Sequence, residues 1–258
     1  MPPSPTPSRT TSLITGATAG IGHEYARQLA ERGDNLVLVA RDSARLEQVA
    51  DDLRRAHHIE VEVLVADLTD RNDLARVEAR VADRERPVDL LVNNAGFGLK
   101  KRFLDNSADE ETAMLEVLVT AVLRLSHAAL GAMAERGHGG IINVSSVAAF
   151  LPRGSYSAAK AWVNSFSEWA HMEYKSRGVT VMALCPGFTK TEFHERMEVT
   201  RGDGFMWLDV DFLVSRSLKD FDKGRTYSIP GAQYKTIIAL TRAIPSRVLR
   251  LTQSVGRR

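Results

Sequence analysis

The sequence contains very little cysteine: Cys185 is the only one among 258 residues. A single cysteine excludes a disulfide within the chain, which is the usual condition in a reducing compartment, so we expect a cytoplasmic location. Cys185 lies in the apolar run Val-Met-Ala-Leu-Cys-Pro. This setting favours a small core residue over a reactive nucleophile.

Long hydrophobic runs without charge are also missing. The most apolar stretch, residues 113–134, carries Glu116, Arg124 and His127, which predicts a buried helix rather than a membrane span. Residues 1–10 include four of the nine prolines and no apolar run, so we expect a disordered segment and no signal peptide. With 44% hydrophobic and 26% charged residues, the whole sequence has the composition of an ordinary soluble globular protein.

Acidic residues are absent from the C-terminal end. Eight Lys or Arg and no Asp or Glu follow from Lys223 onward, whereas the first 222 residues carry 26 basic and 32 acidic groups. Apolar and basic residues alternate through residues 231–258, which indicates a basic amphipathic extension of two helices interrupted at Pro245. Such an extension packs on its own domain or contacts an anionic membrane surface. Nucleic-acid binding is not expected, because no recognised motif accompanies the charge.

Two common functional motifs are missing. There is no G-x-S-x-G elbow, which disfavours a serine hydrolase, and no histidine or cysteine spacing suggests a metal site. The G-x-G-x-x-G fingerprint is absent too, but the apolar run 12–15 leads directly into Gly16-x-x-x-Gly20-x-Gly22 and then into a helical pattern. Glycines between a strand and a helix let the backbone approach a pyrophosphate.

Further apolar runs at 36–40, 61–65, 90–92, 140–144, 179–184 and 227–229 alternate with helical patterns. This alternation predicts an α/β fold, a doubly wound parallel sheet of about seven strands with helices on both faces, in one domain over residues 11–230. Ligands of such sheets bind at the carboxyl ends of the strands. The glycine turn, Arg41, Asp67 with Leu68, and residues 93–96 all fall there.

Arg41 follows the second strand, about 20 residues after the glycines, where a fingerprint of this kind meets the adenosine ribose. An arginine there, with Arg45 one helical turn on, suits a 2′-phosphate and therefore predicts NADP over NAD. Asp42 beside it weakens this preference. The alternative is that Arg41 is a solvated loop charge.

Tyr156 and Lys160 are four residues apart, so in a helix their side chains leave the same face. A nearby ammonium lowers the pKa of a phenol from its ordinary value of about 10, and a phenol tuned toward neutrality can give or take a proton. We therefore predict a lowered pKa for Tyr156. The alternative is an exposed pair without chemistry.

Four motifs together resemble the short-chain dehydrogenase/reductase family, over residues 11–193. They are Thr15-Gly16-x-x-x-Gly20-Ile21-Gly22, Asn93-Asn94-Ala95-Gly96, Tyr156-x-x-x-Lys160 and Pro186-Gly187. Residues 156–193 are similar to the 3-oxoacyl and 17β-hydroxysteroid reductase branch. The resemblance implies a Rossmann-like domain that moves a hydride between NADP(H) and a carbonyl or alcohol carbon of an apolar, 3-oxoacyl or steroid-like substrate.

The resemblance also implies roles for individual residues. Ser146 would bind the substrate oxygen, with Ser145 as the alternate, and Tyr156 and Lys160 would complete the catalytic group. The implied cofactor-binding residues are Gly16, Thr18, Gly20, Ile21, Gly22, Arg41, Asp67, Leu68, Asn94, Ala95, Gly96, Tyr156, Lys160, Pro186, Gly187, Thr189 and Thr191.

Three further expectations concern the surroundings of the site. Residues 192–208 are predicted to form a lid, whose Phe205, Met206 and Trp207 contact an apolar substrate or only dock the lid. Trp162, Phe166 and Trp169 favour core or a subunit interface over substrate contact. By analogy with the family, we expect a homodimer or homotetramer.

Two departures from the family pattern stand out. Ser146 comes only ten residues before Tyr156, so the connection 147–154 is shorter than usual. Leu118 stands where the family usually has an asparagine of the proton relay, and leucine cannot hydrogen-bond. The alternative function is therefore a catalytically impaired, nucleotide-binding regulatory or scaffold protein.

Overall fold

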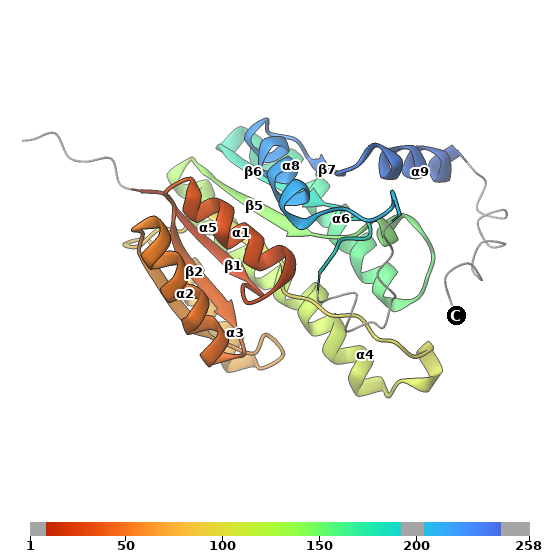
Figure 1. Ribbon diagram of the computed structural model, residues 1–258, viewed down its shortest axis with the longest axis horizontal. Coiled ribbons are helices and arrows are strands. Elements are labelled where there is room, and N and C mark those ends of the chain that lie inside the picture. Colours follow the sequence, from red (N-terminus) through yellow and green to blue (C-terminus); the bar gives the residue numbers. More distant parts are fainter. Residues whose placement is uncertain (1–8, 192–203, 244–258) are drawn as a thin grey trace, which may run out of the picture.

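A computed structural model describes residues 9–191 and 204–243 of the protein (Figure 1). Most of the N-terminal segment predicted to be disordered, residues 192–203 of the predicted lid and the second C-terminal helix lie outside the described residues.

The centre of the molecule is a parallel sheet of seven strands in the order β3-β2-β1-β4-β5-β6-β7. The strands are β1 (Thr11–Thr15), β2 (Asn35–Ala40), β3 (Val61–Val65), β4 (Leu90–Asn93), β5 (Gly139–Val144), β6 (Val179–Leu184) and β7 (Tyr227–Ser228). Every adjacent pair is parallel, with Leu13 opposite both Val37 and Leu91. The predicted doubly wound fold is confirmed, and the strand order reverses between β1 and β4.

Helices connect the strands, and their ends follow from local sequence. They are α1 (Gly20–Glu31), α2 (Ser43–His57), α3 (Arg71–Val81), α4 (Ala108–Leu115), α5 (Ala121–Arg136), α6 (Ser155–Tyr174), α8 (Val210–Asp222) and α9 (Ala232–Ala243). Asp42 and Asp70 accept backbone N–H bonds at the starts of α2 and α3. Gly137 ends α5 with a positive φ of 80°, which glycine adopts without strain.

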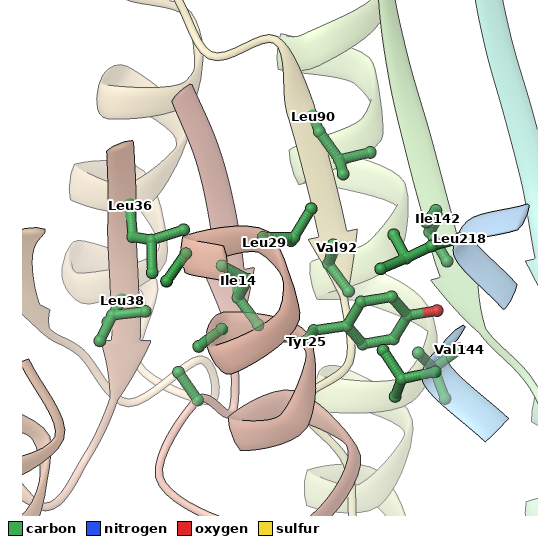
Figure 2. Packing of buried hydrophobic residues seen from close by; sticks show 14 of the residues in the cluster. Ile14, Tyr25, Leu29, Leu36, Leu38, Leu90, Val92, Ile142, Val144 and Leu218 are labelled. Carbon is green, nitrogen blue, oxygen red and sulfur yellow. The ribbon is translucent and has the colours of Figure 1, made fainter. Parts of the chain in front are cut away.

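Two apolar layers enclose the sheet. Side chains of α1, α2 and α8 cover one face, and those of α3, α5 and α6 cover the other. Figure 2 shows the first layer, in which Tyr25 and Leu29 of α1 point onto Ile14, Val92 and neighbouring strand residues. Because both faces are buried, the strands are apolar on both sides, as their uninterrupted Val and Leu runs indicate.

Helices α4 and α5 form one continuous helix, Ala108–Arg136, through a π-helical turn at Glu116–Thr120. By length and composition this helix would be able to cross a membrane, but half of its most apolar window is buried inside the protein. Its buried side chains join the layer under the sheet, and Arg124 pairs with Glu78 of α3. The helix therefore has the contacts of a core helix, as the charges in the sequence predict.

Candidate active site

A cavity of about 670 Å³ opens at the carboxyl ends of the central strands. Its walls hold nearly all of the residues that the sequence singles out, from four separate motifs. They are Gly16, Thr18, Gly20, Ile21, Arg41, Asp67, Leu68, Asn94, Ala95, Gly96, Ser146, Tyr156, Lys160, Pro186, Gly187, Thr189 and Thr191. The fold therefore gathers the glycine turn and the Tyr-Lys pair into one cavity.

The glycine turn is held by Asn94 across the point where the strand order reverses. The Asn94 side-chain amide donates to the carbonyls of Thr15 at 2.9 Å and Gly16 at 3.1 Å. In return, the Thr15 hydroxyl accepts from the N–H groups of Asn94 and Ala95, both at 3.0 Å. These four bonds fix the first turn of the cavity floor to β4.

Gly22 is the one predicted cofactor residue outside the cavity wall. It is buried beneath the turn, where a Cβ would lie 2.2 Å from the Gly16 carbonyl oxygen and 2.3 Å from the Asn94 side-chain nitrogen. Its place in the motif is explained by this close packing of α1 against the turn, and its role in cofactor binding stays a prediction.

Arg41 and its neighbours form the far end of the cavity. Arg41 is 71% exposed and lies 3.6 Å from the carboxylate of Asp67. Burial raises the pKa of Asp67, but hydrogen bonds from Thr69 and the charge of Arg41 outweigh this and lower it. The Asp42 carboxylate accepts the N–H of Arg45 at 3.0 Å and so caps α2. Asp42 therefore has a structural role at the start of α2, although it also lines the cavity.

Ser146, Tyr156 and Lys160 meet at the inner end. The Tyr156 hydroxyl is hydrogen-bonded to the Ser146 side chain, whose oxygen also accepts from Ala148 N–H at 3.1 Å. The Lys160 Nζ lies 5.8 Å from the centroid of the Tyr156 ring and donates to the Val144 carbonyl at 2.7 Å. Ser145 also lines the cavity, and its hydroxyl donates to the Lys160 carbonyl at 3.0 Å, which holds α6 to the end of β5.

The pKa predicted for Tyr156 has the wrong direction. Burial raises the pKa of the Tyr156 phenol to about 12, and the hydrogen bond with Ser146 only partly opposes this. The ammonium of Lys160 is directed at the Val144 carbonyl, and burial lowers the pKa of Lys160 to about 8, with Cys185 opposing. The desolvation of both groups was not visible in the sequence, and it is the largest cause of both pKa shifts.

The lowered pKa of Lys160 predicts a pH-dependent stability. Between about pH 8 and pH 10 the unfolded lysine holds its proton and the folded one loses it, so stability rises with pH. The expected slope is up to about 1.4 kcal/mol per pH unit, absent below pH 8. Tyr156, with its raised pKa, opposes this only above pH 10. Urea unfolding of the wild type and Lys160→Met across this range measures the difference, and parallel curves would contradict it.

A buried carboxylate that sequence analysis did not single out holds the start of α6. Ser155, next to Tyr156, donates to Glu111 of α4 at 2.5 Å. The other Glu111 oxygen accepts from Asn106 at 2.9 Å. Gly154 precedes the helix with a φ of 101°, a conformation that favours glycine. These contacts fix the first turn of α6 and therefore the point from which the Tyr156 side chain extends into the cavity.

Leu118 lies in the π-helical turn, fully buried, and lines the cavity. A Cβ on Gly96 would come within 2.7 Å of its side chain and 4.0 Å of Lys160 Nζ. The leucine therefore fills the space beside the lysine with methyl groups. π-helical turns occur often at functional sites, and this one interrupts the helix at the cavity wall.

Some residues that line the cavity belong to none of the sequence motifs. They are Val39, Ala40, Ala66, Phe97, Gly98, Val117 and Val144. Most of them stand next to a predicted residue at a strand end, so strand-end position was the available signal. Phe97 and Val117 carry no motif of their own.

Comparison with known proteins agrees with the fold and the cavity described above. The family model described as short chain dehydrogenase matches residues 10–201. The chain belongs to the short-chain dehydrogenase family. A short-chain dehydrogenase from Sphingobium yanoikuyae, solved in complex with NADPH, is 35% identical with a TM-score of 0.84, over 95% of this chain and 96% of that one.

Two curated relatives point to different activities. The very-long-chain 3-oxoacyl-CoA reductase of Anas platyrhynchos is 35% identical over 70% of this chain and 60% of its own length. The human inactive hydroxysteroid dehydrogenase-like protein 1 is 32% identical over 70% of this chain and 56% of its own length. This short-chain dehydrogenase thus spans about 60% of the length of the curated relatives it matches.

Proposed function

We propose that this protein is an NADP(H)-dependent oxidoreductase that moves a hydride between the nicotinamide and a carbonyl or alcohol carbon of an apolar substrate. The observation that carries the proposal is the hydrogen-bonded Ser146 and Tyr156 beside Lys160, in the same cavity as the glycine turn. A proton donor and a dinucleotide cradle are what such a reaction requires.

The cavity fits a dinucleotide. Gly16 and Gly20 leave its floor without side chains at the start of α1, where free N–H groups favour a pyrophosphate. A Cβ on Gly20 would lie 3.1 Å from Thr191, so the turn after β6 stands over this floor. Arg41 and Arg45 line the end suited to a 2′-phosphate. When bound, NADPH supplies the hydride.

The protein's own groups handle the proton and the substrate oxygen. Ser146 would orient the carbonyl, and Tyr156 would deliver its proton to the oxygen as charge develops there. The phenol is protonated at neutral pH, as proton delivery to the substrate oxygen requires. Lys160, mostly charged at neutral pH, would stabilise the phenolate left behind.

The proposed substrate is a 3-oxoacyl or steroid-like ketone. The walls beside the catalytic group are apolar, formed by Phe97, Val117 and Leu118. Apolar walls with a few convergent polar groups are typical of sites for hydrophobic small molecules. The relative named as a 3-oxoacyl-CoA reductase supports the acyl class.

A substrate screen tests the activity directly. Purified protein is incubated with NADPH and a panel of 3-oxoacyl thioesters, steroid ketones and aliphatic ketones, and NADPH absorbance is followed. We expect consumption with at least one apolar ketone. Binding of NADPH without consumption across the panel would contradict the proposal and favour the alternative below.

Arg41→Ala tests the choice of cofactor. Removing a charge-assisted contact from a solvent-exposed site is expected to weaken NADPH binding about tenfold and leave NADH binding unchanged. Fluorescence titration with both dinucleotides measures this. Arg55→Ala is the matched control, because Arg55 is an exposed arginine paired with Asp52 on α2 outside the cavity wall. Tighter NADH than NADPH binding by the wild type would refute the preference.

A second candidate function is a nucleotide-binding regulatory or scaffold protein without turnover. Leu118 beside Lys160 and the relative named as inactive favour it. In that case NADPH binds and no ketone is reduced. The substrate panel with the wild type separates the two, and turnover gained by Leu118→Asn would attribute the impairment to Leu118.

Oligomerisation and membrane contact are further parts of the proposal. Met172 and Trp169 on α6, and Leu123 on α5, are exposed apolar side chains that would suit the subunit interface of a homodimer or homotetramer. Analytical ultracentrifugation of wild type and Met172→Glu tests this.

Helix α9 exposes Ile237 and Leu240 near the basic C-terminal end, which suits peripheral contact with an anionic membrane by an otherwise cytoplasmic protein. Co-sedimentation with phosphatidylserine liposomes, before and after truncation at Ala243, tests that contact.

A further inference from the structure

One side chain ties the C-terminal helix α9 to the turn after β6. Tyr234 is 2% exposed. Its hydroxyl accepts the N–H of Phe188 at 2.8 Å and donates to the carbonyl of Met206. A phenol has one proton to donate and a lone pair to accept with, so both capacities are used. Two stretches of chain far apart in sequence are thereby joined through α9.

The ring of Tyr234 lies directly on Gly187. A Cβ at position 187 would lie 1.9 Å from the ring Cζ and within 2.4 Å of both Cε atoms. The backbone of Gly187 has no positive φ, so glycine is required there for space and not for its conformation. The aromatic ring thus occupies the volume of the missing side chain and covers the main chain of the turn.

The two stretches that Tyr234 joins also pair with each other. Leu208 N–H donates to the Phe188 carbonyl at 2.9 Å, and Lys190 N–H donates to the Leu208 carbonyl at 3.0 Å. The rings of Phe188 and Trp207 pack with centroids 5.4 Å apart. The Tyr234 hydroxyl adds its bond to Phe188 N–H next to these two backbone bonds. The backbone at 187–188 is therefore held by the ladder to Leu208, by the Tyr234 hydroxyl and by the Tyr234 ring.

We propose that Tyr234 is a positioning residue that fixes the turn Pro186–Thr191 for the nicotinamide end of the cofactor. The inference rests on the proposed function, because this turn supplies Pro186, Gly187 and Thr189 to the cavity wall. Tyr234 acts from behind the wall, through the N–H of Phe188 and the main chain of Gly187. It orders the wall against which the nicotinamide would lie, and it makes α9 part of the site.

Tyr234→Phe tests this, because it keeps the ring and leaves the Phe188 N–H and the Met206 carbonyl without their partner. We expect NADPH affinity to fall about tenfold. The affinity for adenosine 2′,5′-bisphosphate, which has no nicotinamide and occupies only the Arg41 end, should stay within twofold. Isothermal titration of both ligands measures the split. An equal loss for both ligands, or no loss for either, would overturn the inference.

Tyr25→Phe is the matched control. Tyr25 is also fully buried, and its hydroxyl bonds Ser217 of α8 rather than the turn. Both affinities should remain those of the wild type in this variant. If the wild type binds the bisphosphate and NADPH but reduces nothing, the proposed activity fails while the positioning role is still measured. If the wild type binds neither ligand, both fail.

A pair of space-changing variants tests the ring contact independently of the hydroxyl. Gly187→Ala should weaken NADPH binding at least tenfold, because its methyl group collides with the Tyr234 ring. In the double variant Gly187→Ala with Tyr234→Ala, the methyl group enters the vacated space. We therefore expect no further loss beyond that of Tyr234→Ala alone. Additive losses would show that the ring and the glycine do not share that space.

Discussion

Tyr156→Phe is expected to lower kcat for ketone reduction by a factor of about 100 to 10,000, the range that a positioned proton donor contributes. The phenylalanine ring keeps the packing of α6 but has no proton to deliver to the substrate oxygen. The affinity for NADPH should remain within twofold, because the Tyr156 hydroxyl bonds Ser146 and none of the groups that hold the glycine turn.

The experiment combines NADPH absorbance at saturating substrate with fluorescence titration of the cofactor. Tyr174→Phe is the control, since Tyr174 ends the same helix and packs its ring against Trp169 away from the cavity. Turnover of Tyr156→Phe within tenfold of the wild type would contradict the role given to this tyrosine. A parallel loss of NADPH binding would point instead to a disrupted cavity.

Gly22→Ala is expected to weaken NADPH binding about tenfold to a hundredfold and to lower the free energy of unfolding by about 1–3 kcal/mol. The added methyl group would meet the Gly16 carbonyl at 2.2 Å and the Asn94 amide at 2.3 Å. These are the two groups whose hydrogen bond holds the turn to β4, so the clash cannot be relieved by a flexible side-chain end. Either the turn moves into the cavity or Asn94 releases it.

Gly131→Ala is the matched control, because no atom lies within 4 Å of a Cβ placed at this position in α5. That variant should gain about 0.5–1 kcal/mol of stability, as expected for alanine in a helix interior. NADPH titration and urea unfolding of both variants give the comparison. Unchanged cofactor binding by Gly22→Ala would mean that the turn tolerates displacement.

The sheet was predictable because apolar runs and glycine turns are local signals. The runs 61–65 and 179–184 coincide with β3 and β6 as the structure has them. The motif residues at the strand ends were predictable for the same reason, since parallel strands bring their carboxyl ends to one edge. The family and the doubly wound fold are both confirmed.

The features that sequence did not reveal depend on burial or on distant contacts. The raised pKa of Tyr156 results from its burial, which spacing to Lys160 does not report. Tyr234 is 46 residues from its partner Phe188 and belongs to a segment that composition marked only as basic and amphipathic. Glu111 reaches Ser155 across 44 residues with no motif at either end. Such contacts become visible only when the chain is folded.

The order of the strands divides the lining of the cavity between two segments of the chain. The strands β1, β2 and β3, with Arg41 and Asp67, are encoded before residue 69, whereas Ser146, Tyr156 and Lys160 come after β4 in the chain. Asn94 joins the two segments by donating to the main-chain carbonyls of Thr15 and Gly16, so a donor sequence that also keeps the Thr15 hydroxyl would preserve all four bonds. A graft of the first 68 residues from an NAD-preferring relative would therefore exchange the nucleotide preference as one unit. Ser146, Tyr156 and Lys160 of the recipient protein would still carry out the proton transfer.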